Sequence, residues 1–144
     1  METKNLKQRF AALKLESQDD LNTLNEILEE IQAVNFPKDL IVSLLNVLEN
    51  NPKFHFGAPG MIVHTIEKIY MQQFTDEEYF DLLIQSVERA PTEYNLWLMN
   101  RLMNTFEDES QIKKGLTVFH KVKRETMNDG LRELAQEFIE NFDE

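Results

Sequence analysis

The stretch LNTLNEILEEI, residues 21–31, carries the pattern that decides the fold. Its apolar residues recur every three or four positions, at Leu21, Leu24, Leu28 and Ile31. This is the spacing of one face of an α-helix, whereas a half-buried strand alternates apolar and polar residues. The same spacing returns near the end of the chain, at Leu131, Leu134, Phe138 and Phe142. Because strand-like alternation is nowhere sustained, the sequence predicts an all-α protein.

Helix-start signals divide this pattern into about eight helices. Ser17, Thr92, Asp108 and Asn128 each precede an apolar-periodic run, and their side-chain oxygens can accept a free N–H of the first turn. The predicted helices span residues 3–15, 18–34, 37–50, 60–73, 76–89, 92–106, 109–125 and 129–142.

Short connections between these helices predict how they pack. Consecutive helices joined by a few residues lie as antiparallel neighbours. We therefore expect four successive hairpins, stacked as a short right-handed α-α superhelix of HEAT-like type. The 144 residues are enough for one core, so a single all-helical domain over 1–144 is expected. A compact irregular helical bundle is the alternative, because no repeat shows residue identity at a fixed period.

The composition narrows the compartment and the chemistry. Hydrophobic residues make up 42% of the chain and charged residues 28%, which is typical of globular soluble proteins. The absence of cysteine excludes disulfides, thiolate nucleophiles and thiolate metal sites, and it fits the cytoplasm. No signal peptide is recognisable, and no run approaches the roughly 18 apolar residues of a membrane span. We expect a cytoplasmic protein that does not enter a membrane.

The formal net charge of −11 favours a basic protein partner over nucleic acid. Nucleic-acid affinity depends largely on Lys and Arg neutralising phosphates, whereas an acidic surface steers basic proteins. One run of acids without an intervening base offers an alternative docking face, although such runs are more often solvated: Asp19, Asp20, Glu26, Glu29 and Glu30. The opposite charge gathers only modestly, at Lys113, Lys114, Lys121 and Arg124, where a solvated role is favoured over RNA binding.

The segment FHFGAPGM, residues 54–61, interrupts the helical pattern. A glycine-bearing loop before a helix can bind an anion, but this one lacks the spacing and the lysine of a phosphate loop. Gly57 and Gly60 permit unusual backbone angles, and Phe54 and Phe56 can hold the loop against the core. We interpret the segment as a structural corner.

The sequence contains no complete catalytic or metal-binding set. His64 and Glu67 form an H-x-x-E pair on one helix face, which suggests a metal site or an acid/base pair. Two ligands do not complete a zinc site, and His55 and His120 lie on separate elements. A structural or interface role for the pair is favoured, and we expect a protein that is not an enzyme and holds no cofactor or metal.

The stretch YNLWLMNRLMN, residues 94–104, has two different sides. Its apolar side would face the core, whereas the other side carries Trp97, Asn100, Arg101 and Asn104. An exposed tryptophan beside arginine is typical of interface centres, although Trp97 could instead pack on the neighbouring hairpin. Helices 60–73 and 92–106 are both second members of hairpins and would line one surface. The predicted partner-binding patch is His64, Glu67, Lys68, Trp97, Asn100, Arg101 and Asn104.

Two segments resemble small all-helical immunity proteins of bacterial polymorphic-toxin and contact-dependent growth inhibition systems. They are NNPKFHFGAPGMIVHTIEKIY, residues 50–70, and PTEYNLWLMNRLMN, residues 91–104. Proteins of this family bind a cognate toxin domain, often a nuclease, in the cytoplasm and block its active site or substrate surface. The resemblance implies that this chain neutralises such a toxin. The alternative is a helical-repeat adaptor or scaffold protein without inhibitory activity.

Overall fold

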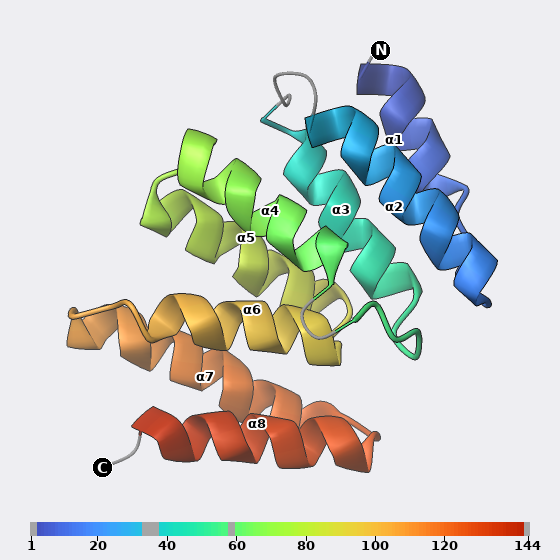
Figure 1. The fold of residues 1–144 in the computed structure, drawn as a ribbon. Coiled ribbons are helices and arrows are strands. Elements are labelled where there is room, and N and C mark those ends of the chain that lie inside the picture. Colours follow the sequence, from blue (N-terminus) through green and yellow to red (C-terminus); the bar gives the residue numbers. More distant parts are fainter. Residues whose placement is uncertain (1–2, 33–37, 58–59, 143–144) are drawn as a thin grey trace. The chain divides into compact units, whose positions relative to one another are not determined.

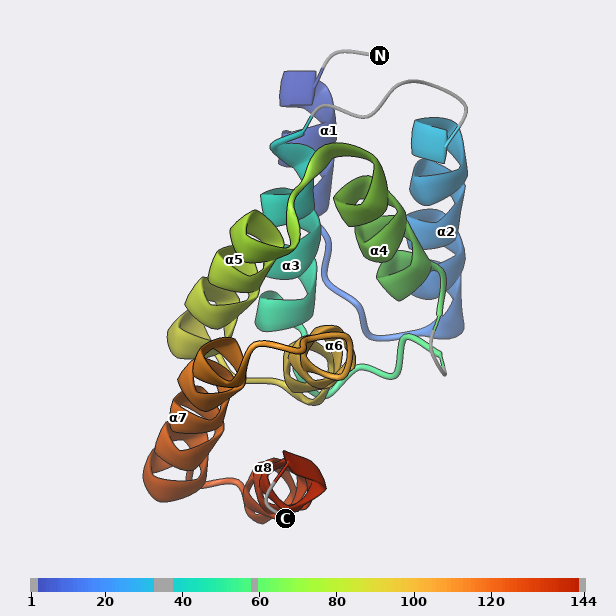
Figure 2. The same ribbon diagram turned by 90° about the vertical axis from the view of Figure 1, so that its left-hand side faces the viewer.

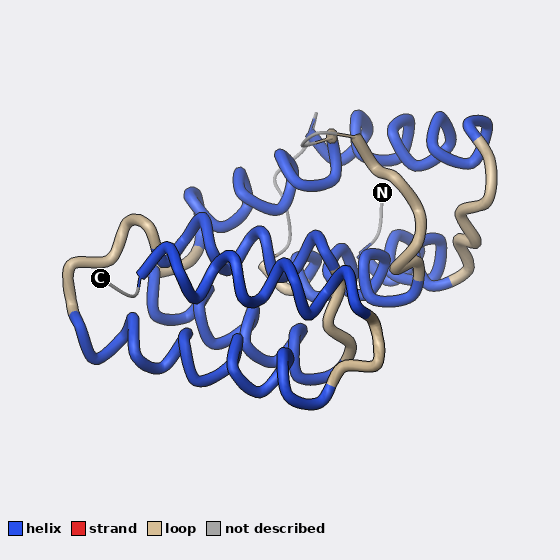
Figure 3. Tube along the Cα trace, turned by 90° about the horizontal axis from the view of Figure 1, so that it is seen from below, coloured by secondary structure: helices blue, strands red, loops and turns tan. Residues whose placement is uncertain are grey.

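The computed structural model describes residues 3–32, 38–57 and 60–142, whose regular secondary structure is entirely α-helical, with helices joined by loops and no strand among these residues (Figure 3). The helices are α1 Thr3–Ala11, α2 Gln18–Gln32, α3 Leu40–Asn50, α4 Met61–Gln73, α5 Asp76–Arg89, α6 Glu93–Met103, α7 Glu109–Glu125 and α8 Asp129–Phe142 (Figure 1). The all-α prediction is confirmed, and each predicted helix has its counterpart.

Three helix boundaries differ from the prediction by three residues or more: α3 begins at Leu40 and not at residue 37, α6 ends at Met103 and not at residue 106, and the end of α1 differs most. The apolar spacing predicted that the first helix continues to residue 15, but α1 ends at Ala11. The backbone N–H of Leu15 donates instead to Asn51 Oδ1 at 3.1 Å, and Asn51 Nδ2 donates to the Val47 carbonyl. A side chain at the end of α3 therefore takes the N–H that a longer α1 would have used.

The chain forms two compact units, residues 1–75 and 76–144. In the first unit α1 packs on α3, α2 packs on α4, and α3 packs on α4. The pairing of α3 with α4 follows the hairpin prediction, but the main partner of α1 is α3. Its sequence neighbour α2 contacts α1 less extensively, for example through the ion pair of Glu30 with Arg9. The single domain over 1–144 and the continuation of the stack from one unit to the next stay predictions.

The second unit consists of two stacked helix hairpins. The α5–α6 hairpin lies against the α7–α8 hairpin, with α5 on α7 and α6 on α8. Figure 2 looks nearly along α6 and α8, with α5 and α7 beside them. The two hairpins and their stacking are those predicted from the short connections.

Each unit buries its own apolar face. In the first unit Leu24 and Leu28 of α2 are fully buried, together with most apolar residues of α3. In the second unit Phe119 of α7 and Phe138 of α8 are buried, and their ring centroids lie 5.6 Å apart. The buried positions recur at helical spacing, so burial of apolar area is what selects the helix faces that pack.

Side-chain caps close the starts of four helices as predicted. Ser17 Oγ accepts the Asp20 N–H before α2, and Asn128 Oδ1 accepts the Leu131 N–H at α8. Thr92 caps α6. Asp108 Oδ1 accepts both the hydroxyl and the backbone N–H of Ser110 at α7, at 2.7 and 2.8 Å. These bonds satisfy N–H groups that have no partner within the helix.

The cap of α7 leads to a prediction about acid stability. The Ser110 hydroxyl and then its N–H hold the pKa of Asp108 below its ordinary value. Because the pKa is lowered in the folded state, the cap stabilises the fold above the unfolded pKa, and this contribution is lost as the pH falls through the lowered pKa. Asp108→Asn keeps an acceptor oxygen but cannot titrate. We expect the melting temperature of this variant to fall less between pH 6 and pH 3 than that of the parent chain.

Thermal unfolding followed by circular dichroism at several pH values measures this difference. Glu107→Gln removes the same charge from the neighbouring exposed residue and is the matched control. The control should lose stability with acid as the parent does. An equal acid loss in Asp108→Asn and in the parent would contradict the assigned role of the cap.

The segment before α4 is a structural corner, as interpreted from its sequence. Gly57 and Gly60 have φ of 116° and 90°, a region that side-chain-bearing residues rarely occupy. Phe56 is 2% exposed, and its ring meets Phe54 edge to face with centroids 5.0 Å apart. The glycines turn the chain and the aromatic pair secures the turn. Ala58 and Pro59 lie outside the described residues.

Candidate partner-binding site

A buried polar network fixes how α6 begins. Thr92 Oγ1 accepts the Asn95 N–H at 3.1 Å, and Asn95 Oδ1 accepts the Thr92 N–H at 2.8 Å. Asn95 Nδ2 also donates to Ser86 Oγ at 3.1 Å and to the Ala90 carbonyl at 2.9 Å. The network ties α6 to the end of α5. It thereby sets which side of α6 faces the core.

That rotation brings Trp97 and Arg101 together on one side of α6. The two residues are one helical turn apart, and the Arg101 guanidinium carbon lies 4.7 Å from the centroid of the Trp97 ring. Trp97 is half-buried and Arg101 is exposed. Contact between a guanidinium and an indole holds both side chains in place before any partner arrives.

The two asparagines of the predicted patch differ in accessibility. Asn104 is exposed at the end of α6. Asn100 is only 7% exposed, and its buried Oδ1 has no hydrogen-bond partner in the described part of the chain. Asn100 therefore offers a partner far less surface than Trp97, Arg101 or Asn104 do.

The other three predicted contact residues lie on α4. His64 and Lys68 are exposed, Glu67 is partly buried, and their spacing places all three on neighbouring positions of the helix surface. They belong to the first unit, whereas the α6 residues belong to the second. The predicted residues therefore form two groups, one on α4 and one on α6. That the two groups make up a single patch stays a prediction.

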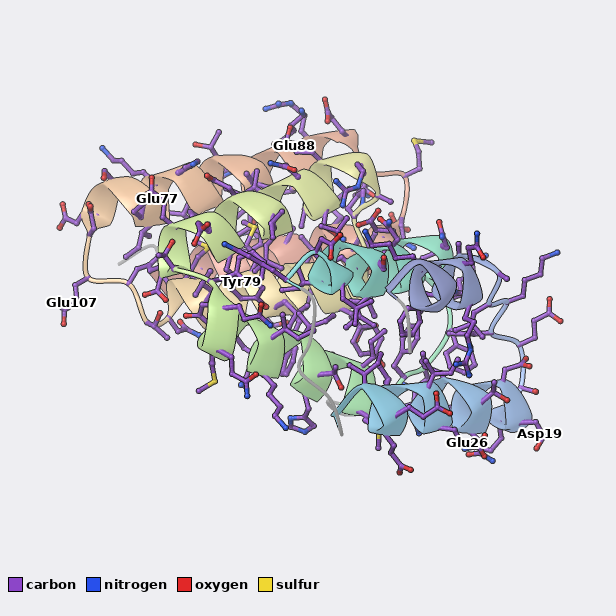
Figure 4. The ribbon with its side chains drawn as sticks, turned by 90° about the horizontal axis from the view of Figure 1, so that it is seen from above. Asp19, Glu26, Glu77, Tyr79, Glu88 and Glu107 are labelled. Atoms are coloured by element: carbon purple, nitrogen blue, oxygen red, sulfur yellow. The ribbon has the colours of Figure 1, made fainter. Side chains whose placement is uncertain are left out.

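The alternative acidic face is formed by α2. Asp19 and Glu26 project from this helix away from the rest of the first unit (Figure 4). Asp20 has a structural task, because its Oδ2 accepts the N–H groups of Glu16 and Ser17, and the Glu16 bond above all lowers its pKa. Glu30 pairs with Arg9 at 3.2 Å, and Glu29 is exposed. Asp19, Glu26 and Glu29 are the residues of this face that a partner would meet most directly.

Neither a metal-binding cluster nor a membrane-spanning helix is found in the described part of the chain. Among residues 3–32, 38–57 and 60–142, no group of three or more histidine, cysteine, aspartate or glutamate side chains could hold a metal ion. None of the helices described there is long and apolar enough to cross a membrane.

A groove between α5 and α7 was missed by the sequence reasoning. It has a volume of about 220 Å³ and lies within the second unit. Its α7 side consists of Val118, Lys121, Val122 and Glu125, residues that recur at helical spacing. That spacing could have placed these four residues on one face of the helix before the structure was known. The α5 side comes from a distant part of the sequence, so the hollow itself depends on how the two helices pack.

No family model matches the chain, and it matches no curated protein and no solved structure. The residues of the site are therefore the basis on which we consider function.

Proposed function

We propose that this chain is an immunity protein that binds a cognate bacterial toxin domain and neutralises it. The pairing of Trp97 with Arg101 on α6 is the observation that carries the proposal. Tryptophan and arginine are the residues most enriched among those that dominate binding energy at protein interfaces. Their pre-formed contact would reduce the entropy lost on binding. The resemblance of residues 50–70 and 91–104 to immunity proteins supports the same function.

The charge of the chain supports a toxin that acts on nucleic acid. Such a toxin needs a basic surface to bind phosphates, and this chain carries a formal charge of −11. An acidic binder would approach that surface quickly and compete with the substrate for it. Binding in the cytoplasm is part of the proposal, because the toxin would have to be stopped where its substrate lies.

Co-expression tests the proposal directly. We expect a toxin domain to be encoded immediately upstream, and this domain would be expressed in bacteria with and without this chain. We expect the toxin alone to stop growth and the chain to restore growth and to copurify with the toxin. Copurification without restored growth would favour the adaptor alternative. If the chain neither binds the toxin nor restores growth, the immunity function is refuted.

Alanine substitutions at the α6 pair test the site within that complex. We expect Trp97→Ala and Arg101→Ala each to weaken toxin binding by about 2 kcal/mol or more, or roughly 30-fold in Kd, if both are central anchors. Isothermal titration calorimetry measures the change. Met127, 94% exposed, and Arg124 supply the matched controls Met127→Ala and Arg124→Ala. A folded double variant with unchanged affinity would exclude this patch and direct attention to α2.

A further inference from the structure

The groove between α5 and α7 has an apolar floor. Val87 of α5 is 1% exposed, and Val118 and Val122 of α7 are 8% and 6% exposed. Pro91, which follows α5, completes the lining on that side. The floor lacks charge and can accept a hydrocarbon chain, because contact with it removes apolar surface from water.

The rim of the groove has more negative than positive charge. Glu88 of α5 faces Lys121 of α7, with Glu88 Oε2 3.9 Å from Lys121 Nζ, which is too long for a hydrogen bond. Both side chains are about half exposed, so water screens this ion pair and it is readily exchanged. Glu125 lies one turn beyond Lys121 and has no ion-pair partner in the described part of the chain. Figure 4 shows Glu88 on the surface of the second unit.

Both helices also end at this groove. α5 ends at Arg89 and α7 ends at Glu125, and the lining residues come from the final turns of each helix and the residues that follow. The C-terminal end of a helix carries partial negative charge from its unpaired carbonyls. Lys123 in the last turn of α7 is turned toward α8, where it donates to Gln136. Among the lining side chains, two carboxylates stand against the single positive charge of Lys121. Arg89 and Arg124 in the last helical turns, and Arg132, which donates to the Thr126 carbonyl, are not lining residues. The lining together with the two helix ends therefore favours a cation.

The size of the groove restricts its occupant. Its volume of about 220 Å³ is below the range of roughly 300–1,000 Å³ usual for small-molecule pockets and suits one long side chain. An anion would be repelled by Glu88 and Glu125. An apolar side chain would remove water from these carboxylates without replacing their hydrogen bonds. A lysine or arginine side chain matches both the apolar floor and the charged rim of the groove. Its hydrocarbon stem can lie on the valines while its positive head group remains at the rim.

We propose that this groove binds a lysine or arginine side chain projecting from the surface of a partner protein. The incoming cation displaces Lys121 from Glu88 and is held between Glu88 and Glu125. The identity of the partner as a toxin rests on the function proposed above. The groove adds a second contact, separate from the α6 pair, that reads the positive charge of the partner.

Methyl NMR of the full chain tests the proposal with a tetra-arginine peptide as the probe. We expect the peptide to shift the methyl signals of Val87, Val118 and Val122. A tetra-citrulline peptide of nearly the same shape but without charge should leave them in place. The double variant Glu88→Gln/Glu125→Gln should raise the Kd of the arginine peptide at least fivefold. Lys121→Ala should lower it about threefold, because it frees Glu88.

The matched control removes two charges elsewhere in the same unit. Glu133→Gln/Glu137→Gln acts on exposed residues of α8 and should leave the Kd within twofold of the parent value. Equal weakening by both double variants would show general electrostatic attraction and overturn the proposal. Equal shifts from the citrulline peptide, or binding that leaves the groove methyls unmoved, would overturn it as well. Melting temperatures of all variants verify that they are folded.

The groove and the immunity function can fail separately. A toxin that binds Glu88→Gln/Glu125→Gln as tightly as the parent would refute the groove and leave neutralisation intact. If the chain binds the arginine peptide in the groove but neither binds nor neutralises the toxin, the immunity function is refuted and the proposal for the groove stands.

Discussion

Gly60→Ala is expected to lower the free energy of unfolding of the first unit by about 3 kcal/mol or more. Gly60 has φ 90° and ψ 159°, a region open almost only to glycine, where a side chain costs about 1–3 kcal/mol. An added Cβ would also lie 2.3 Å from the carbonyl oxygen of Phe56 and 2.9 Å from its carbonyl carbon. Both atoms are backbone, so the clash can be relieved only by moving the corner itself.

Urea denaturation followed by far-UV circular dichroism measures this loss. The only tryptophan, Trp97, lies in the second unit, so fluorescence alone would not report on the corner. Gly130→Ala is the matched control, because a Cβ there meets only the side-chain oxygen of Asn128 at 3.2 Å. We expect the control to change stability by about 1 kcal/mol or less. Similar stabilities for Gly60→Ala and the parent would show that the corner does not need glycine.

Asn95→Leu is expected to destabilise the second unit by about 3–5 kcal/mol. Asn95 is fully buried, and its side chain makes three hydrogen bonds, with Thr92, Ser86 and Ala90. Leucine has a similar volume but leaves the Thr92 N–H and the Ala90 carbonyl without this partner. Each buried polar group left unpaired costs about 1–3 kcal/mol. Trp97 fluorescence in urea reports the loss, because Trp97 lies on the same helix.

Asn95→Asp separates the hydrogen bonds from the packing. The carboxylate still accepts the Thr92 N–H but faces the Ala90 carbonyl that the amide donated to at 2.9 Å. Protonation restores a donor, so the stability of this variant relative to the parent should improve as the pH falls. Thr92→Ser retains the hydroxyl and should cost only about 1 kcal/mol. A pH-independent difference between Asn95→Asp and the parent would contradict the assigned contacts.

Local signals predicted the helices and most of their starts correctly. Leu24, Leu28 and Ile31 lie on the buried side of α2, as their spacing requires. Thr92 caps α6 as expected, but its partner Asn95 was not recognised, since the usual capping box has glutamate or glutamine at that position. The further bonds of Asn95 to Ser86 and Ala90 join two helices and leave no mark in a local pattern.

The candidate-site residues on α6 also divide into what local sequence predicts and what depends on contacts between helices. The spacing of Trp97 and Arg101 was sufficient to place them on one helix face, and the structure adds their ring contact. Asn100 shares that region by position but is almost fully buried. Its burial depends on the helices that pack against α6, and a helical wheel of α6 alone gives no information about them.

The amino-acid sequence by itself determined the all-α class, the helix faces, the caps and the net charge. The first three depend on residues within a few positions of one another, and the net charge is a sum over all charged residues. Only the tertiary structure decided that α1 ends early, that α1 packs on α3, and that a charged-rimmed groove lies between α5 and α7. These features arise where Asn51 meets Leu15 or Glu88 meets Lys121. Such meetings depend on which apolar faces pack together, and several pairings would bury similar area.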